Sequence, residues 1–129
     1  MYGFSVKMSG AMDDVVQKVT DELKVEGFGV LTEIDVQATL KKKINVDRKP
    51  YKILGACNPQ LANQAINAEA DIGLLLPCNV VVREEDDGSM TVAFMDPMAV
   101  LNLTENETVH KIAPEVKARL ERVCGALKA

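Results

Sequence analysis

Tryptophan is absent from the chain, and aromatic residues make up only 4% of its 129 residues. Proteins that hold single-stranded nucleic acids rely on aromatic side chains on which the bases stack. The formal net charge of −4 at pH 7 also opposes such binding, because neutralisation of phosphate charge dominates it. We therefore expect no nucleic-acid partner. The one basic cluster, Lys41–Lys43 with Arg48 and Lys49, is interpreted as a solvated helix surface.

Long apolar runs are lacking too. The longest, Ile72–Val82, is interrupted by Pro77 and Asn79 and is shorter than the ~20 residues that a membrane-spanning helix needs. The first residues, Met1–Lys7, lack the basic start and apolar core that are typical of a signal peptide. The sequence therefore predicts no membrane partner and a cytoplasmic location.

Cysteine and histidine are scarce, with three cysteines and one histidine. An odd number of cysteines in a chain without a visible leader does not fit a disulfide framework, so free thiols are expected. The chain also has no Cys-x-x-Cys, Gly-x-Gly-x-x-Gly, Walker, His-Glu-x-x-His or Gly-x-Ser-x-Gly pattern. No catalytic signature is therefore visible, and the sequence leaves open whether the protein is an enzyme.

The length fits a single domain over residues 1–129 with a real hydrophobic core. Apolar residues alternate with polar ones in some segments and recur at helical spacing in others. Strands are expected at 2–8, 28–34, 50–57, 74–84 and 90–95, and helices between Gly10 and Gly27, at 36–44, at 58–70 and from 104 to 127, with a helical turn at 98–103.

Local signals mark several of these boundaries. Ser9 is the expected N-cap of the first helix, and Asn58 followed by proline predicts the start of another. Asp86–Gly88 predicts a hairpin between the fourth and fifth strands. Thr104–Glu107 matches a capping box, and Pro114 inside the last helical pattern predicts a kink or a second start.

This order of elements predicts an α+β fold. We expect a two-layer sandwich, in which a mostly antiparallel sheet of about five strands carries helices on one face. Helices on one face leave the other face of the sheet partly apolar. The sequence therefore also favours a homodimer.

Two cysteines stand in similar surroundings. Cys57 and Cys78 each lie beside or near a proline and directly before an asparagine, in Gly55–Pro59 and Leu76–Val80. If the strands that carry them pair antiparallel, the end of one meets the start of the other, and the two thiols become neighbours. Parallel pairing would put the thiols at opposite edges of the sheet. Antiparallel pairing is our expectation.

These segments give the main candidate site, which would bind a small ligand or ion through Cys57, Asn58, Cys78 and Asn79. Functional side chains are often held on irregular backbone beside a rigid scaffold. Glu33 and Asp35, at the end of a strand, are secondary candidates for lining the same pocket. The competing interpretation is structural, because free cysteine is among the most buried residue types and packs as a small hydrophobe.

A metal site is only weakly indicated. A structural zinc ion takes four ligands, whereas the chain offers Cys57 and Cys78 with one distant histidine, His110. We interpret His110 as a boundary residue beside an apolar stripe and Cys124 as part of the core or of a dimer contact. The sequence identifies no cofactor.

Three segments together resemble a known family. They are Glu26-Gly27-Phe28-Gly29-Val30-Leu31-Thr32-Glu33-Ile34-Asp35, Tyr51-Lys52-Ile53-Leu54-Gly55-Ala56-Cys57-Asn58-Pro59 and Asp71-Ile72-Gly73-Leu74-Leu75-Leu76-Pro77-Cys78-Asn79-Val80. The chain is similar to the bacterial and archaeal family catalogued as domain of unknown function 302. The resemblance implies a β-α-β(4)-α fold and a dimer, and it implies no activity. Pro114 is the one departure from the family pattern.

The leading functional hypothesis is a homodimeric binding module for a small ligand or ion near the two Cys-Asn segments. The first alternative is a thiol-dependent redox or sulfur-transfer enzyme that uses Cys57 and Cys78. The second is a purely structural or assembly domain.

Overall fold

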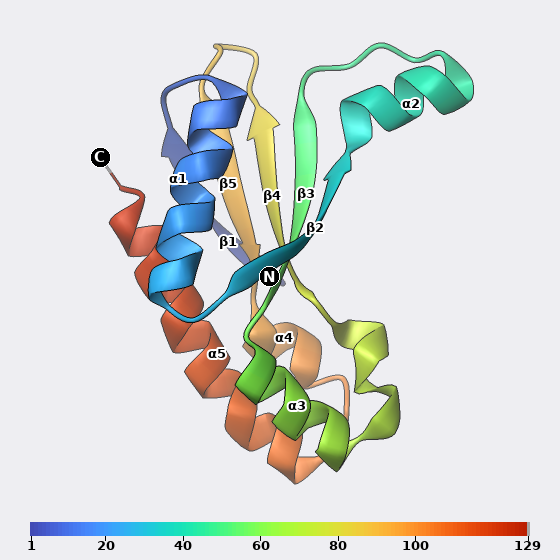
Figure 1. Ribbon diagram of the computed structural model, residues 1–129, viewed down its shortest axis with the longest axis vertical. Helices are drawn as coiled ribbons and strands as arrows, with labels where there is room; N and C mark the ends of the chain where they lie inside the picture. Colours follow the sequence, from blue (N-terminus) through green and yellow to red (C-terminus); the bar gives the residue numbers. More distant parts are fainter. Residues whose placement is uncertain (129) are drawn as a thin grey trace.

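A five-stranded antiparallel sheet in the order β1-β5-β4-β3-β2 forms one layer of the protein (Figure 1). The computed structural model describes residues 1–128. The elements are β1 (Gly3–Met8), α1 (Met12–Val25), β2 (Gly29–Asp35), α2 (Val36–Ile44), β3 (Tyr51–Cys57), α3 (Pro59–Ala68), the 3-10 helix η1 (Ala70–Leu75), β4 (Cys78–Glu84), β5 (Met90–Met95), α4 (Pro97–Leu101) and α5 (Glu107–Ala126).

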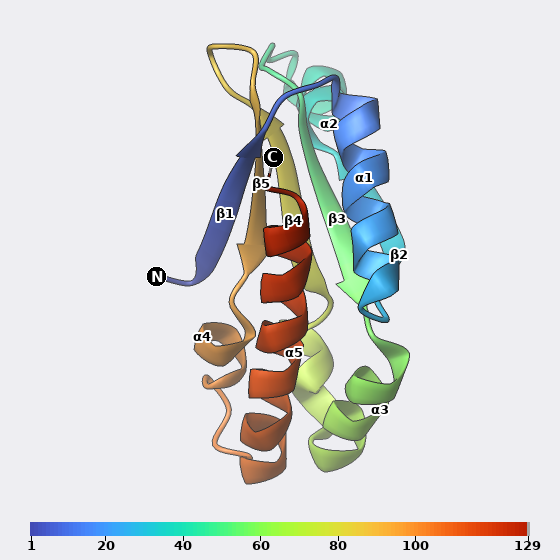
Figure 2. The same cartoon turned by 90° about the vertical axis from the view of Figure 1, so that its left-hand side faces the viewer.

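Helices α1 and α5 form the second layer, against one face of the sheet (Figure 2). Because successive strand side chains point to opposite faces, every second residue of β4, such as Val80 and Val82, enters the core. The apolar stripes of the two helices meet them there, with Leu23 of α1 and Leu120 of α5 fully buried. The expected α+β sandwich is confirmed.

One end of the molecule is helical. α3, η1 and α4 lie beyond the end of the sheet where β3 stops and β4 begins (Figure 1). α3 and α4 pack against α5, and η1 packs against α3. The hydroxyl of Thr104, before α5, donates to Glu69 after α3 at 2.5 Å, and the Asn106 amide donates to Ala68 O at 2.8 Å. These contacts between α3 and α5 hold the helical end together.

Two local features predicted from the sequence, a helix cap and a hairpin turn, are confirmed at the expected residues. The Asn58 Oδ1 accepts the Leu61 N–H at 3.1 Å and caps α3, with Pro59 as the first helical residue. The turn at Asp86–Gly88 joins β4 to β5 as an antiparallel hairpin. Both signals act through neighbouring residues alone, which is why the sequence predicts them well.

The predicted caps of α1 and α5 are wrong. Ala11, which has no side-chain acceptor, occupies the N-cap of α1 in place of Ser9. Asn106 caps α5 in place of Thr104, because its Oδ1 accepts the N–H groups of Thr108 and Val109 at 3.0 and 3.2 Å. The Thr104 hydroxyl is engaged with α3 instead, so a tertiary contact replaces the predicted capping box.

The predicted fourth strand begins too early. Residues 74–77 precede β4, and Ala70–Leu75 form η1 with Ile72 fully buried. A short apolar run does not distinguish a buried strand from a buried helical turn. Pro114 also does not start a second helix, since α5 is continuous across it, with Ala113 and Val116 buried on either side.

The face of the sheet opposite α1 and α5 carries an apolar row. Ile34, Ile53, Val81 and Ala93 are successive partners across β2, β3, β4 and β5 and point away from the helices. We call these four residues the open-face row. Between Met1 and Lys128, no helix combines the length and the apolar character that a membrane crossing requires.

Gly55 is required by close packing on that face. A Cβ atom at this position would lie 2.2 Å from Thr32 Oγ1 and 2.9 Å from Pro77 Cγ. We expect Gly55→Ala to lower the free energy of unfolding by about 1–3 kcal/mol, the usual cost of overpacking. Urea denaturation measures the change. Gly125→Ala is the control, because no atom beyond its chain neighbours and its own helix backbone lies within 4 Å of its Cβ position. Equal stability of the two variants would contradict the prediction.

Asp96 joins α4 to α5. Its carboxylate accepts the Met98 N–H at 2.9 Å and the Lys117 ammonium at 3.0 Å. Burial alone would raise the pKa of Asp96, but the Lys117 hydrogen bond and charge and the backbone donors together lower it. The charged form is therefore favoured in the folded state.

The lowered pKa of Asp96 makes its contribution depend on pH. We expect Asp96→Ala to cost about 1 kcal/mol at pH 7 through the lost cap. Asp96→Asn keeps an acceptor and loses only the charge, and so tests the ion pair. The charge-dependent stability is present above the unfolded pKa of about 3.9 and is lost as pH falls through the lower folded value. Thermal unfolding of the parent and of Asp96→Asn from pH 7 to pH 2 measures this charge-dependent stability. A stability difference between the two proteins that grows on acidification would contradict the prediction.

Candidate functional site

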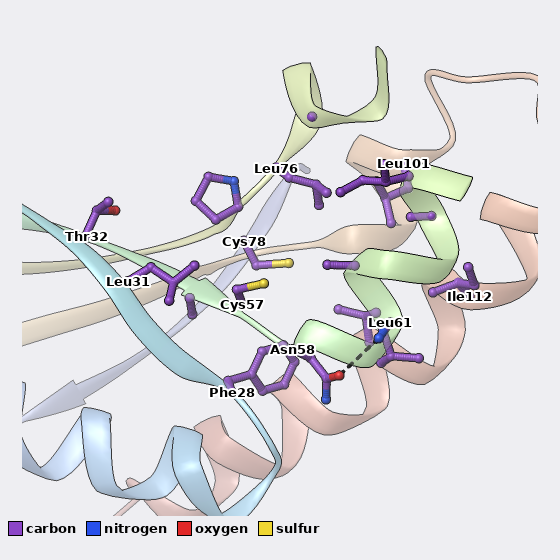
Figure 3. Close-up of a pocket in the computed structure, with 17 residues that line it drawn as sticks. Phe28, Leu31, Thr32, Cys57, Asn58, Leu61, Leu76, Cys78, Leu101 and Ile112 are labelled. Carbon is purple, nitrogen blue, oxygen red and sulfur yellow. Dashed lines mark hydrogen bonds between the residues drawn. The ribbon is translucent and has the colours of Figure 1, made fainter. Parts of the chain in front are cut away.

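A cavity of about 320 Å³ lies where β3 ends and β4 begins, between the sheet and the helical end (Figure 3). β2, β3, α3, α5 and the segment from η1 to β4 all contribute to its wall. The lining residues are Phe28, Leu31, Thr32, Ala56, Cys57, Asn58, Leu61, Ala62, Ala65, Ile66, Gly73, Leu76, Pro77, Cys78, Leu101, Ile112 and Val116. Apart from Thr32, Asn58 and the two thiols, these side chains are apolar.

The register of β3 and β4 brings the two thiols to this cavity. The strands pair antiparallel, as expected, and Ala56 lies directly opposite Cys78. Cys57 is therefore one residue from the partner of Cys78. Cys57 is the last residue of β3, and Figure 3 shows both sulfur atoms directed into the cavity toward α3.

The two thiols differ in exposure. Cys78 is only 6% exposed, whereas Cys57 is half-buried. Burial, with a smaller contribution from the neighbouring Cys57, raises the pKa of Cys78 to about 12. Cys78 is therefore a neutral thiol at physiological pH and is not a ready nucleophile.

Asn58 lies in the cavity wall, but its side chain already has a structural role. Its Oδ1 caps α3, and its Nδ2 faces the turn between α1 and β2, where a Cβ on Gly27 would lie 2.9 Å from it. Gly27 has φ +84°, a backbone conformation that glycine adopts without strain. Asn58 thus fixes how α3 leaves β3 and how closely the α1–β2 turn approaches.

A bulge in β2 shapes one side of the cavity. The pairing of β2 with β3 shifts between Val30 and Thr32, so Leu31 is the extra residue. Leu31 is 68% exposed and reaches the cavity rim, while Phe28 is buried at the cavity wall. Bulges often redirect a side chain beside a functional site, and here the redirected side chain is apolar.

The other predicted ligand residues lie elsewhere. Asn79 follows Cys78 and therefore points to the opposite face of the sheet, where it lines a separate groove with Arg83. Glu33 lies 3.6 Å from the Lys52 ammonium, and Asp35 caps α2 by accepting the Ala38 N–H at 2.9 Å. The structure brings Cys57, Asn58 and Cys78 together and leaves the other three outside the cavity.

The histidine, His110, does not line the cavity that holds the two thiols. His110 Nε2 lies 2.5 Å from Thr104 O, at the start of α5. Cys124 is buried in the core of the sandwich. Within residues 1–128, no group of three or more histidine, cysteine, aspartate or glutamate residues is arranged to hold a metal ion.

The sequence did not point to the helical wall of the cavity. α3 supplies Ala62, Ala65 and Ile66, and α5 supplies Ile112 and Val116. In the sequence these residues form ordinary apolar stripes, and a stripe that borders a cavity has the same period as one that fills a core. Only the small size of the alanines hints that space remains beside α3.

Comparisons with known proteins support the fold and the family. A crystal structure of an uncharacterised conserved DUF302 protein from Bacillus stearothermophilus superposes with a TM-score of 0.91 at 29% identity, covering 99% of each chain. No curated protein matches the sequence. The model of the family described as domain of unknown function DUF302 matches residues 4–127. The chain belongs to this family.

Proposed function

We propose that the protein binds a small, predominantly apolar ligand in the cavity beside Cys57 and Cys78. The observation that carries the proposal is the apolar wall, which borders a half-open space of about 320 Å³, within the ~300–1,000 Å³ range of ligand pockets. The rim includes Leu31, 68% exposed, and Ile66, 47% exposed. Large apolar side chains exposed at a cavity mouth suit a ligand of the same character.

The composition of the wall favours a ligand over a packing defect. Protein interiors are close-packed, and an empty apolar space lowers stability in proportion to its volume. Ala56, Ala62 and Ala65 face the cavity, where larger side chains would fill it. Three small residues at one site keep the space open, which is consistent with an occupant.

The wall also favours an apolar molecule over an ion. Among the residues that the structure describes, none of those lining the cavity carries a charged side chain. An ion would lose its hydration without a compensating charge, which costs several kcal/mol or more. Thr32 and Asn58 supply the few polar atoms, enough to orient one polar group of a ligand.

Two further features belong to the same proposal. The open-face row would pair with a second copy of the chain to give a homodimer, because the row is apolar and is flanked by the polar residues Asn79 and Arg83, as in an interface with an apolar core and a polar rim.

The three free cysteines suit a reducing compartment, and we propose the cytoplasm.

Filling the cavity tests the ligand site. Ala62→Phe places a ring in the space beside α3, so we expect the uncharged fluorophore N-phenylnaphthylamine to bind at least about tenfold more weakly, a loss of ~1.4 kcal/mol. Fluorescence titration measures the dissociation constant. Ala126→Phe, at an exposed position near the end of α5, is the matched control and should bind as the parent does. Equal affinity of parent and Ala62→Phe, or no binding by the parent, would overturn the proposal.

A charge in the open-face row tests the dimer. We expect Val81→Lys to give a monomer in sedimentation equilibrium where the parent sediments as a dimer, because an unpaired ammonium would be desolvated in the contact. Val25→Lys, at a 75% exposed position on α1, should leave the dimer unchanged. A monomeric parent, or a Val81→Lys variant that stays dimeric, refutes this part of the proposal.

A further inference from the structure

We infer that Cys57 and Cys78 form a reversible dithiol–disulfide pair that exchanges with organic disulfides whose apolar group enters the cavity. The inference rests on the proposed function, since the reagent reaches the thiols through the same apolar space.

The strand register gives the geometry. Ala56 and Cys78 are direct partners, and Cys57 is the next residue along β3. Paired antiparallel strands lie about 5 Å apart and rise about 3.3 Å per residue, which separates the Cys57 and Cys78 Cα atoms by roughly 6 Å. Strict alternation would direct Cys57 away from Cys78, but β3 ends at Cys57, and both side chains line the same cavity. Disulfides form over Cα separations of about 4.4–6.8 Å. Figure 3 shows both sulfur atoms directed into the same space.

The surroundings suit a disulfide better than a thiolate–metal site. The lining side chains of the described chain include no cation that would neutralise a thiolate, and no third protein ligand accompanies the two thiols within residues 1–128. A disulfide is neutral and apolar, so it leaves no charge in a space lined by Leu61, Leu76 and Pro77.

Exposure assigns an order to the two thiols. Cys57 is half-buried and Cys78 is buried. The Cys57 thiolate attacks one sulfur of the organic disulfide, whose S–S bond breaks, and the released thiolate takes up a proton. The Cys78 thiolate, deprotonated by solvent, then attacks Cys57 Sγ and expels the second thiol. The protein dithiol loses two electrons and two protons, and the organic disulfide becomes two thiols.

The second step depends on pH. Because burial raises the pKa of Cys78 to about 12, only a small fraction of this thiol is ionised at neutral pH. Closure of the protein disulfide should therefore accelerate by about tenfold per pH unit below that pKa, once the mixed disulfide has formed.

The experiment uses reduced protein in a Cys124→Ala background, so that the two cavity thiols alone react. Diethyl disulfide is the apolar probe and cystamine, charged at both ends, is the polar one. Each rate is divided by the rate of the same reagent with a small free thiol, because the two leaving thiols differ in pKa and therefore in intrinsic reactivity. Intact mass and peptide mapping follow the products. We expect a Cys57–Cys78 cross-link that forms at least about tenfold faster with diethyl disulfide, since the charged reagent must be desolvated, and that a reducing dithiol reverses.

Single variants separate the two steps. Cys78→Ser should stop at a mixed disulfide on Cys57, and Cys57→Ser should stay unmodified while the parent reacts fully. Cys78→Ala replaces the serine variant if circular dichroism shows that it does not fold. Separate adducts on both cysteines without a cross-link, faster reaction with cystamine, or modification of Cys78 in Cys57→Ser would overturn the inference.

Failure of the exchange is distinguishable from failure of the ligand site. If the cavity binds ligands and the thiols do not exchange, the reduced protein binds N-phenylnaphthylamine but yields no cross-link. If the cavity binds nothing, fluorophore binding is absent in the reduced parent as well, and the preference for the apolar disulfide disappears.

Discussion

The antiparallel pairing of β3 with β4 is the interaction on which the rest of the site depends. It places Ala56 opposite Cys78, so the end of one strand and the start of the other share an edge of the sheet. Alternation along the strands then sends Cys78 into the cavity and Asn79 to the opposite face. A shift of one residue would exchange these two faces and remove Cys78 from the cavity.

The helical end turns this edge into a cavity. α3 begins directly after Cys57, fixed by the Asn58 cap and by the close approach of Gly27. Hydrogen bonds from Thr104 and Asn106 then hold the end of α3 against the start of α5. The contacts of Thr104 and Asn106 lie outside the cavity wall and hold it in place, so the wall itself needs few polar groups.

Elements set by neighbouring residues could be predicted from the sequence, as the α3 cap at Asn58 and the hairpin at Asp86–Gly88 show. The cap of α5 and the start of β4 could not, since a tertiary contact of Thr104 decides the first and a buried helical turn decides the second. The proximity of Cys57 and Cys78 followed from one assumption about strand direction. The cavity itself depends on how far α3 stands from the sheet, and apolar periodicity carries no information about that distance.

The space beside Cys57 and Cys78 should accept an apolar molecule. Backbone amide NMR of the reduced protein, titrated with N-phenylnaphthylamine, tests it most directly. We expect saturable shifts that cluster at the end of β3, the start of β4 and α3, with the amides of Val81 and Ala93 unchanged. Shifts centred on the open-face row, or none at all, would contradict it.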